Sequence, residues 1–79
     1  MDTLVRAARA RAILDDEVFK DAIDGLKKDQ IDIFLSSASE LDQIAEARLQ
    51  VRAIEALRDR LKSVVNDGQI LERKINKKN

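Results

Sequence analysis

The alternation of apolar and polar positions is clearest between residues 39 and 67, where apolar side chains recur at steps of three and four. These residues are Leu41, Ile44, Ala47, Val51, Ile54, Leu57, Leu61, Val64 and Val65. Their spacing places them on one face of an α-helix, so that charged residues such as Arg52, Glu55 and Arg58 face water or a charged partner. Neither Pro nor Gly interrupts the stretch. We therefore predict one helix over 39–67, about 43 Å long.

A second amphipathic pattern covers residues 16–35. Its apolar face is formed by Phe19, Ala22, Ile23, Leu26, Ile33 and Phe34. The acidic residues 15–17 indicate a helix start, because an Asp cap accepts free backbone N–H groups and acids complement the positive end of the helix dipole. Gln30 lies near the centre of the apolar face, where its amide either pairs with another helix or reaches a solvated edge. Gly25 lies off that face and allows a close helix approach or a slight bend.

The short polar stretch between these two helices contains helix-start signals. Ser37 with Glu40 fits the capping box, and Ser39 with Asp42 gives the same motif two residues later. So short a connection favours an antiparallel helical hairpin, with the 16–35 helix packed along the longer one.

The long helix is expected to stop before Gly68, since glycine readily takes the left-handed conformation that ends many helices. Residues 69–75 carry three apolar side chains and are expected to resume a helix for a turn or two. The Lys- and Asn-rich residues 76–79 are predicted to form a disordered basic tail. Residues 1–75 then make up a single small helical domain.

Residues 3–14 form a third candidate helix, with four Ala and three Arg in twelve positions. Helix propensity is high, but the apolar stripe is thin and Arg11 falls within it. An isolated helix of this length is marginal in water, so we expect it to fray unless it docks. A basic arm that contacts nucleic acid through Arg6, Arg9 and Arg11 has the same appearance.

The predicted fold is therefore all-α: an antiparallel hairpin of 16–35 and 39–67 with a weak N-terminal helix. The long helix presents more apolar positions than the 16–35 helix can cover. A chain of 79 residues is also near the size at which a single core becomes marginal. We expect the core to be completed by oligomerisation, in the manner of a coiled coil, or by a partner protein.

Composition removes several classes of function. The chain has no Cys and no His, which excludes disulfides, Cys/His zinc sites and a Ser-His-Asp triad. Its two glycines stand alone, so there is no phosphate-binding loop, and no residues are singled out as catalytic, metal-binding or cofactor-binding. We predict a protein that is not an enzyme and takes no small-molecule substrate. No apolar run reaches the roughly 20 residues of a membrane span, and we expect a cytoplasmic or virion-associated protein.

The net charge is zero, but it is unevenly distributed. The balance is +2 over residues 1–14, −6 over 15–42, +1 over 43–68 and +3 over 69–79. Basic ends around an acidic middle indicate either attraction between segments or protomers, or ordinary solvated faces. Acids interrupt the basic residues of the long helix, which is unlike a DNA-reading helix.

The segments ARARAILDDEVFKDA and RAIEALRDRLKSVVNDG, in this order, resemble small uncharacterised helical proteins encoded by tailed phages and prophage-like elements. The resemblance covers about residues 7–68 and rests on helix caps and apolar stripes. It implies a phage context, commonly near head and DNA-packaging genes, and carries over no catalytic or binding residue.

The leading hypothesis is a non-enzymatic assembly or adaptor protein that self-associates or docks on a larger protein. Its helix contacts are assigned to Phe19, Ile23, Leu26, Phe34, Leu41, Ile44, Val51, Ile54, Leu57 and Leu61. One alternative is a nucleic-acid-binding packaging or regulatory factor, with phosphate contacts from Arg6, Arg9, Arg11, Arg73 and Lys74. Another is a small inhibitor that binds a host enzyme through the acidic residues 15–42.

Overall fold

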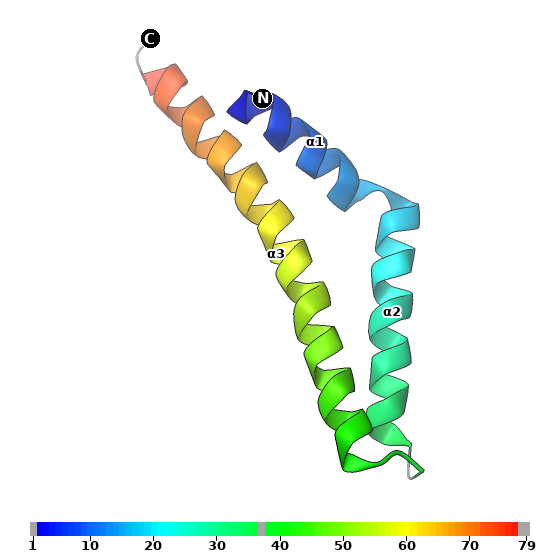
Figure 1. The fold of residues 1–79 in the computed structure, drawn as a ribbon. Coiled ribbons are helices and arrows are strands. Elements are labelled where there is room, and N and C mark those ends of the chain that lie inside the picture. The colour runs from blue at the N-terminus through cyan, green and yellow to red at the C-terminus, as the bar shows by residue number, and fades with distance from the viewer. Residues whose placement is uncertain (1, 37, 78–79) are drawn as a thin grey trace.

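A computed structural model describes residues 2–36 and 38–77. These residues form three helices and no strand: α1 (Thr3–Asp15), α2 (Glu17–Leu35) and α3 (Leu41–Lys77). The all-α prediction is therefore confirmed. The helices α1 and α2 follow one another along the length of α3, which runs in the opposite direction to both (Figure 1). The start of α1 and the end of α3 lie at one end of the molecule, and the turn between α2 and α3 lies at the other.

Asp16 separates α1 from α2 and caps both. It has an extended backbone (φ −66°, ψ 125°), and its N–H donates to the carbonyl of Ile13 at 3.2 Å. Its carboxylate accepts from the backbone N–H of Phe19 at 2.8 Å, which satisfies one free donor of α2. The predicted helix start at residues 15–17 is confirmed. A single residue therefore redirects the chain from one helix into the next.

The turn into α3 is capped by Gln43, which the sequence analysis did not single out. The backbone N–H of Glu40 donates to Oε1 of Gln43 at 2.8 Å, so Gln43 supplies the back-reaching half of a capping box. Ser36 ends α2 and accepts from the N–H of Ala38 at 3.3 Å. The predicted pair of Ser37 and Glu40 cannot be judged, because Ser37 lies outside the described residues.

The predicted end of the long helix at Gly68 is wrong, because α3 continues to Lys77. No glycine among the described residues has a positive φ, so Gly68 is an ordinary helical residue. It is buried against α1: a Cβ added to it would overlap the Cβ of Ala7 and lie 3.9 Å from the carbonyl oxygen of Thr3. Docking of α1 at this position favours an unbroken α3. The tail prediction changes accordingly, since Asn76 and Lys77 are helical and residues 78–79 lie outside the described residues.

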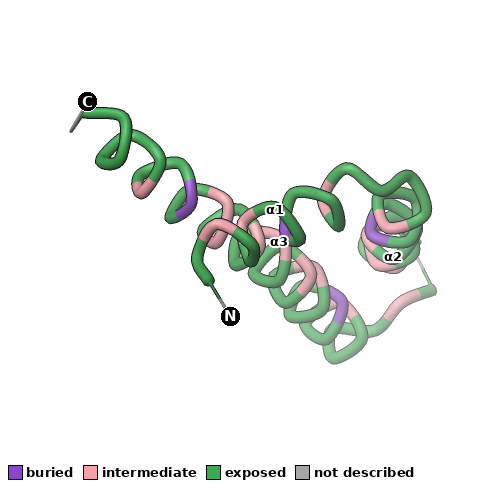
Figure 2. The backbone as a smooth tube through the Cα atoms, turned by 90° about the horizontal axis from the view of Figure 1, so that it is seen from above, coloured by how far each residue is buried: buried purple, intermediate pink, exposed green. Residues whose placement is uncertain are grey.

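The chain buries little. The residues of α3 that face α1 and α2 are spaced alternately three and four apart, as in a coiled-coil seam. They are Ile44, Ala47, Val51, Ile54, Arg58, Leu61, Val65 and Gly68, all buried or half-buried. In the part of the chain that the structure describes, the buried apolar side chains are Ala10, Ile23 and Ala47 (Figure 2). The fully buried positions are thus mostly small residues, whereas the large residues of the seam are only half-buried.

The molecule is a thin rod. Its extents are 62 × 22 × 19 Å and its radius of gyration is 17.4 Å, against about 12 Å for a compact domain of this length. The helix α1 packs mainly on α3 and has little contact with α2. Two helices in sequence along a third leave no further layer to close the structure.

Candidate interaction surface

The predicted helix contacts fall into two groups. Six of the ten lie in the seam between α3 and the other helices and are buried or half-buried: Phe19, Ile23, Ile44, Val51, Ile54 and Leu61. The other four are exposed within this chain. Leu41 is 85% exposed, Leu57 52%, Leu26 49% and Phe34 40%. The chain itself therefore leaves these four side chains largely uncovered.

Arg58 occupies the seam position that the sequence pattern had assigned to Leu57. The seam follows a strict three–four repeat, which selects residue 58 after residue 54, and residue 57 then lies at the side of α3. Arg58 is half-buried, and the aliphatic part of a long side chain can cover apolar surface while its head stays in water. The sequence analysis missed Arg58 because its neighbour Leu57 also fits the three–four spacing and is apolar.

Lys27 of α2 and Glu55 of α3 mark one edge of the α2–α3 seam, with Nζ 3.4 Å from Oε1. Successive helix residues are about 100° apart, which places Leu26 and Leu57 at the opposite edge. The polar residue predicted within the seam, Gln30, is half-buried there and lines a surface hollow with Ser39 and Gln43 of the turn region. One edge of the seam therefore carries an ion pair and the other carries exposed leucines.

Exposed large apolar residues are numerous. Twelve of the described ones are at least 40% exposed: Val5, Ile13, Val18, Leu26, Ile31, Phe34, Leu35, Leu41, Leu49, Leu57, Ile70 and Ile75. Four of them, Ile31, Phe34, Leu35 and Leu41, flank the turn between α2 and α3, and we call them the turn cluster. Leu35 and Leu41 are the most exposed of all, at 80% and 85%. Isolated exposed apolar residues are common, but such a cluster at one end of a molecule is typical of a binding surface.

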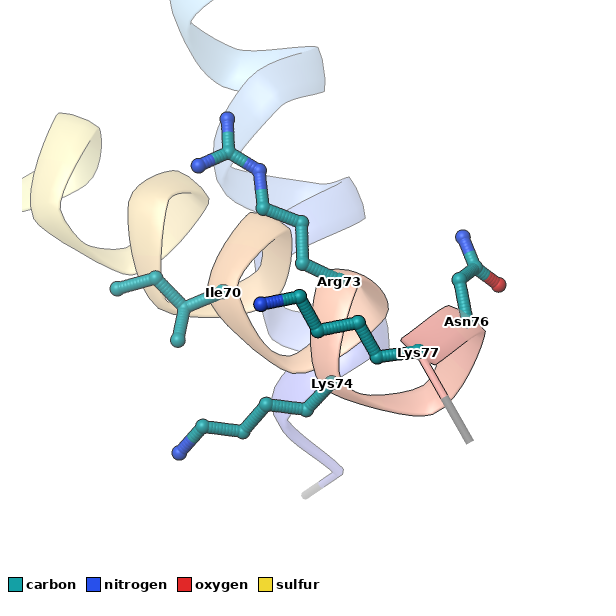
Figure 3. A pocket seen from close by; sticks show the side chains of 5 residues that line it. All are labelled: Ile70, Arg73, Lys74, Asn76 and Lys77. Carbon is teal, nitrogen blue, oxygen red and sulfur yellow. The ribbon is translucent and has the colours of Figure 1, made fainter. Parts of the chain in front are cut away.

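A shallow hollow lies on the last turns of α3. It is lined by Ile70, Arg73, Lys74, Asn76 and Lys77. Ile70, Lys74 and Lys77 point to the same side of the helix, whereas Asn76 points away (Figure 3). This part of α3 extends past the start of α1 (Figure 1). We call it the terminal hollow; its floor is apolar and its rim is basic.

The predicted nucleic-acid contacts do not share one face. Arg9 and Arg11 are two positions apart, about 200° around α1, and therefore point to nearly opposite sides. Arg6 lines a small hollow with Asp67, and Arg11 lines a groove with Glu72. The arginines of α1 are thus distributed around the helix. Arg73 and Lys74 belong to α3 and line the terminal hollow.

The described residues contain no group of three or more Asp or Glu side chains placed to hold a metal ion. Among the same residues, no helix has both the length and the apolar character needed to cross a membrane. Comparisons of the chain with protein families, with curated proteins and with solved structures returned no match.

Proposed function

We propose that this protein is a non-enzymatic helical assembly module that functions by packing its exposed apolar side chains against another protein. The observation that carries the proposal is the number of large apolar residues that stay exposed while few are fully buried. Twelve described large apolar side chains are exposed, whereas two of the three buried apolar residues are alanines. A buried leucine or isoleucine stabilises a fold by about 1.5–3 kcal/mol, and a buried alanine methyl by much less.

The surface area supports the same proposal. The accessible surface is 6354 Å². A compact monomer of 8.9 kDa would have about 4,800 Å², so the chain exposes roughly 1,500 Å² more than a self-contained domain of its size. This excess matches the area that one partner contributes to a large interface. The resemblance to small helical phage proteins would place such a module among phage assembly or packaging components.

The test combines solution mass with the substitutions Leu41→Lys and Leu57→Lys. Light scattering after size-exclusion chromatography should give a mass above 8.9 kDa. Each substitution should lower that mass while circular dichroism shows unchanged helix content, because both side chains are exposed within the chain. Ser63→Lys, at an exposed polar position of the same helix, is the matched control and should leave the mass unchanged.

If the protein is a monomer, a dye that fluoresces on exposed apolar surface shows whether its apolar faces are uncovered. A monomer that binds the dye retains uncovered faces for a different protein. A stable monomer that does not bind it has covered those faces internally, which contradicts the proposal.

Contact with nucleic-acid phosphates is a second candidate, favoured by one observation. The start of α1 and the end of α3 lie together and bring Arg6 and Arg9 to the same end of the rod as Arg73, Lys74 and Lys77 (Figure 1). Binding of this kind weakens steeply as salt rises. Titration of a labelled duplex at several salt concentrations tests this candidate. If the double variant Arg73→Ala with Lys74→Ala bound the duplex with unchanged affinity, these two residues would not contact its phosphates.

A further inference from the structure

The two ends of the rod carry opposite charge. Residues 29–47, around the turn, contain five acids and no base. Residues 2–14 and 67–77, at the other end, contain six bases and three acids. The rod is 62 Å long, and charges in water at physiological salt are screened over about 8 Å. The ends of one molecule therefore hardly attract each other, and only a second molecule can bring these charges together.

Each charged end also presents apolar surface. The turn cluster is accompanied by the acids Asp32, Glu40 and Asp42, all exposed. At the opposite end, Ile70 and the aliphatic stems of Lys74 and Lys77 form the terminal hollow (Figure 3). An apolar cluster with an acidic rim is complementary to an apolar hollow with a basic rim. Both halves of this match are present on the same chain.

We propose that the partner is a second copy of this chain, packed antiparallel so that the turn cluster of each copy lies on the terminal hollow of the other. This inference rests on the proposed function, since it names the partner for the same exposed surface. The arrangement is closed by a two-fold axis: the turn end of the first copy contacts the terminal end of the second, and the turn end of the second contacts the terminal end of the first. A parallel pairing would instead place acids against acids at the turn. If each copy covers its roughly 1,500 Å² of excess surface, about 3,000 Å² is buried, as in obligate homodimers.

Distances between spin labels test the orientation. The chain has no Cys, so Glu40→Cys and Asn76→Cys each give one labelling site, at the turn end and the terminal end. Both positions are exposed. In an antiparallel dimer, two Glu40→Cys labels should be separated by about the 62 Å length of the rod, and so should two Asn76→Cys labels. An equimolar mixture of the two labelled chains should add a population at much shorter distance.

Charge exchange tests the contact itself. Asp42→Lys and Lys74→Glu should each weaken the dimer about fivefold to tenfold, and the chain that carries both should recover most of the loss. Asp59→Lys, at an exposed position in the middle of α3, is the control and should have a smaller effect that no change at Lys74 reverses. Dissociation on dilution, followed by sedimentation, gives these affinities.

The outcomes separate the two proposals. A dimer with short distances between identical labels, or one that Asp42→Lys strengthens, is parallel: it overturns this inference and leaves the proposed function standing. A wild-type chain that stays monomeric at low and high salt also overturns this inference, and dye binding to that monomer then decides the proposed function separately.

Discussion

The two glycines of the chain provide a sharp test of how α1 is held. Both lie inside helices, where alanine is more favourable than glycine by up to about 1 kcal/mol. A Cβ added to Gly25 meets no atom within 4 Å, so Gly25→Ala should stabilise the fold by about 0.5–1 kcal/mol. A Cβ added to Gly68 would overlap the Cβ of Ala7, which is fixed to the backbone and cannot turn aside.

Gly68→Ala must therefore displace α1. Overpacking of this kind costs about 1–3 kcal/mol, which exceeds the gain in helix propensity. We expect a net loss of about 1 kcal/mol, and Tm changes by roughly 4–8 °C per kcal/mol in a domain of this size. The two substitutions are chemically identical but should shift Tm in opposite directions.

The assay is thermal unfolding followed by circular dichroism at one fixed protein concentration, with hydrogen exchange measured over residues 3–15. Gly68→Ala should lower Tm and speed exchange in α1, and Gly25→Ala should raise Tm without that change. Adding Ala7→Gly to Gly68→Ala removes the overlapping methyl. This double variant should therefore be more stable than the sum of the two single changes in unfolding free energy predicts. If Gly68→Ala raised Tm as much as Gly25→Ala, α1 would not be packed on α3 at this position.

Four further predictions concern caps, charges and association. Asp16→Ala removes the acceptor for the N–H of Phe19 and should cost about 1 kcal/mol in urea unfolding, whereas an unchanged midpoint would mean that the cap does not stabilise α2. The Lys27–Glu55 pair is partly exposed, so a double-mutant cycle should give a coupling of no more than about 1 kcal/mol. Val51→Asp places a charge in the seam and should abolish both helicity and association. The Tm of the wild type should rise with protein concentration, because association stabilises the folded chain.

Sequence patterns predicted the parts of the fold that depend on large apolar residues and caps. The helix at 16–35 follows from a stripe that begins after the Asp16 cap, and most of α3 follows from its apolar repeat. The continuation of α3 past residue 67 could not be predicted in the same way. Gly68 is a typical helix end when considered alone, and only its contact with Ala7 makes it an interior residue.

The role of α1 was difficult to predict for the same physical reason. Amphipathic patterns are detected from large apolar side chains, and α1 contacts α3 in part through small ones. Ala10 is buried, and Ala7 lies against Gly68. Small-residue contacts leave almost no periodic signal, so the sequence predicted a weak helix that frays unless it docks. The sequence analysis assigned Leu41 and Leu57 to helix contacts, and both are largely exposed within the chain.

The small residues in the interior and the large residues outside are two aspects of one geometry. Where Ala47, Ala10 and Gly68 face a neighbouring helix, the helix axes can approach closely, and the larger seam residues between these positions, such as Val51 and Ile54, are half-buried. Leucines beside the seam, such as Leu26 and Leu57, then project sideways from the helix pair. Burial of these side chains would add hydrophobic free energy, and the described residues of the chain leave them uncovered. The residues that make the rod thin therefore also create the face through which it would associate.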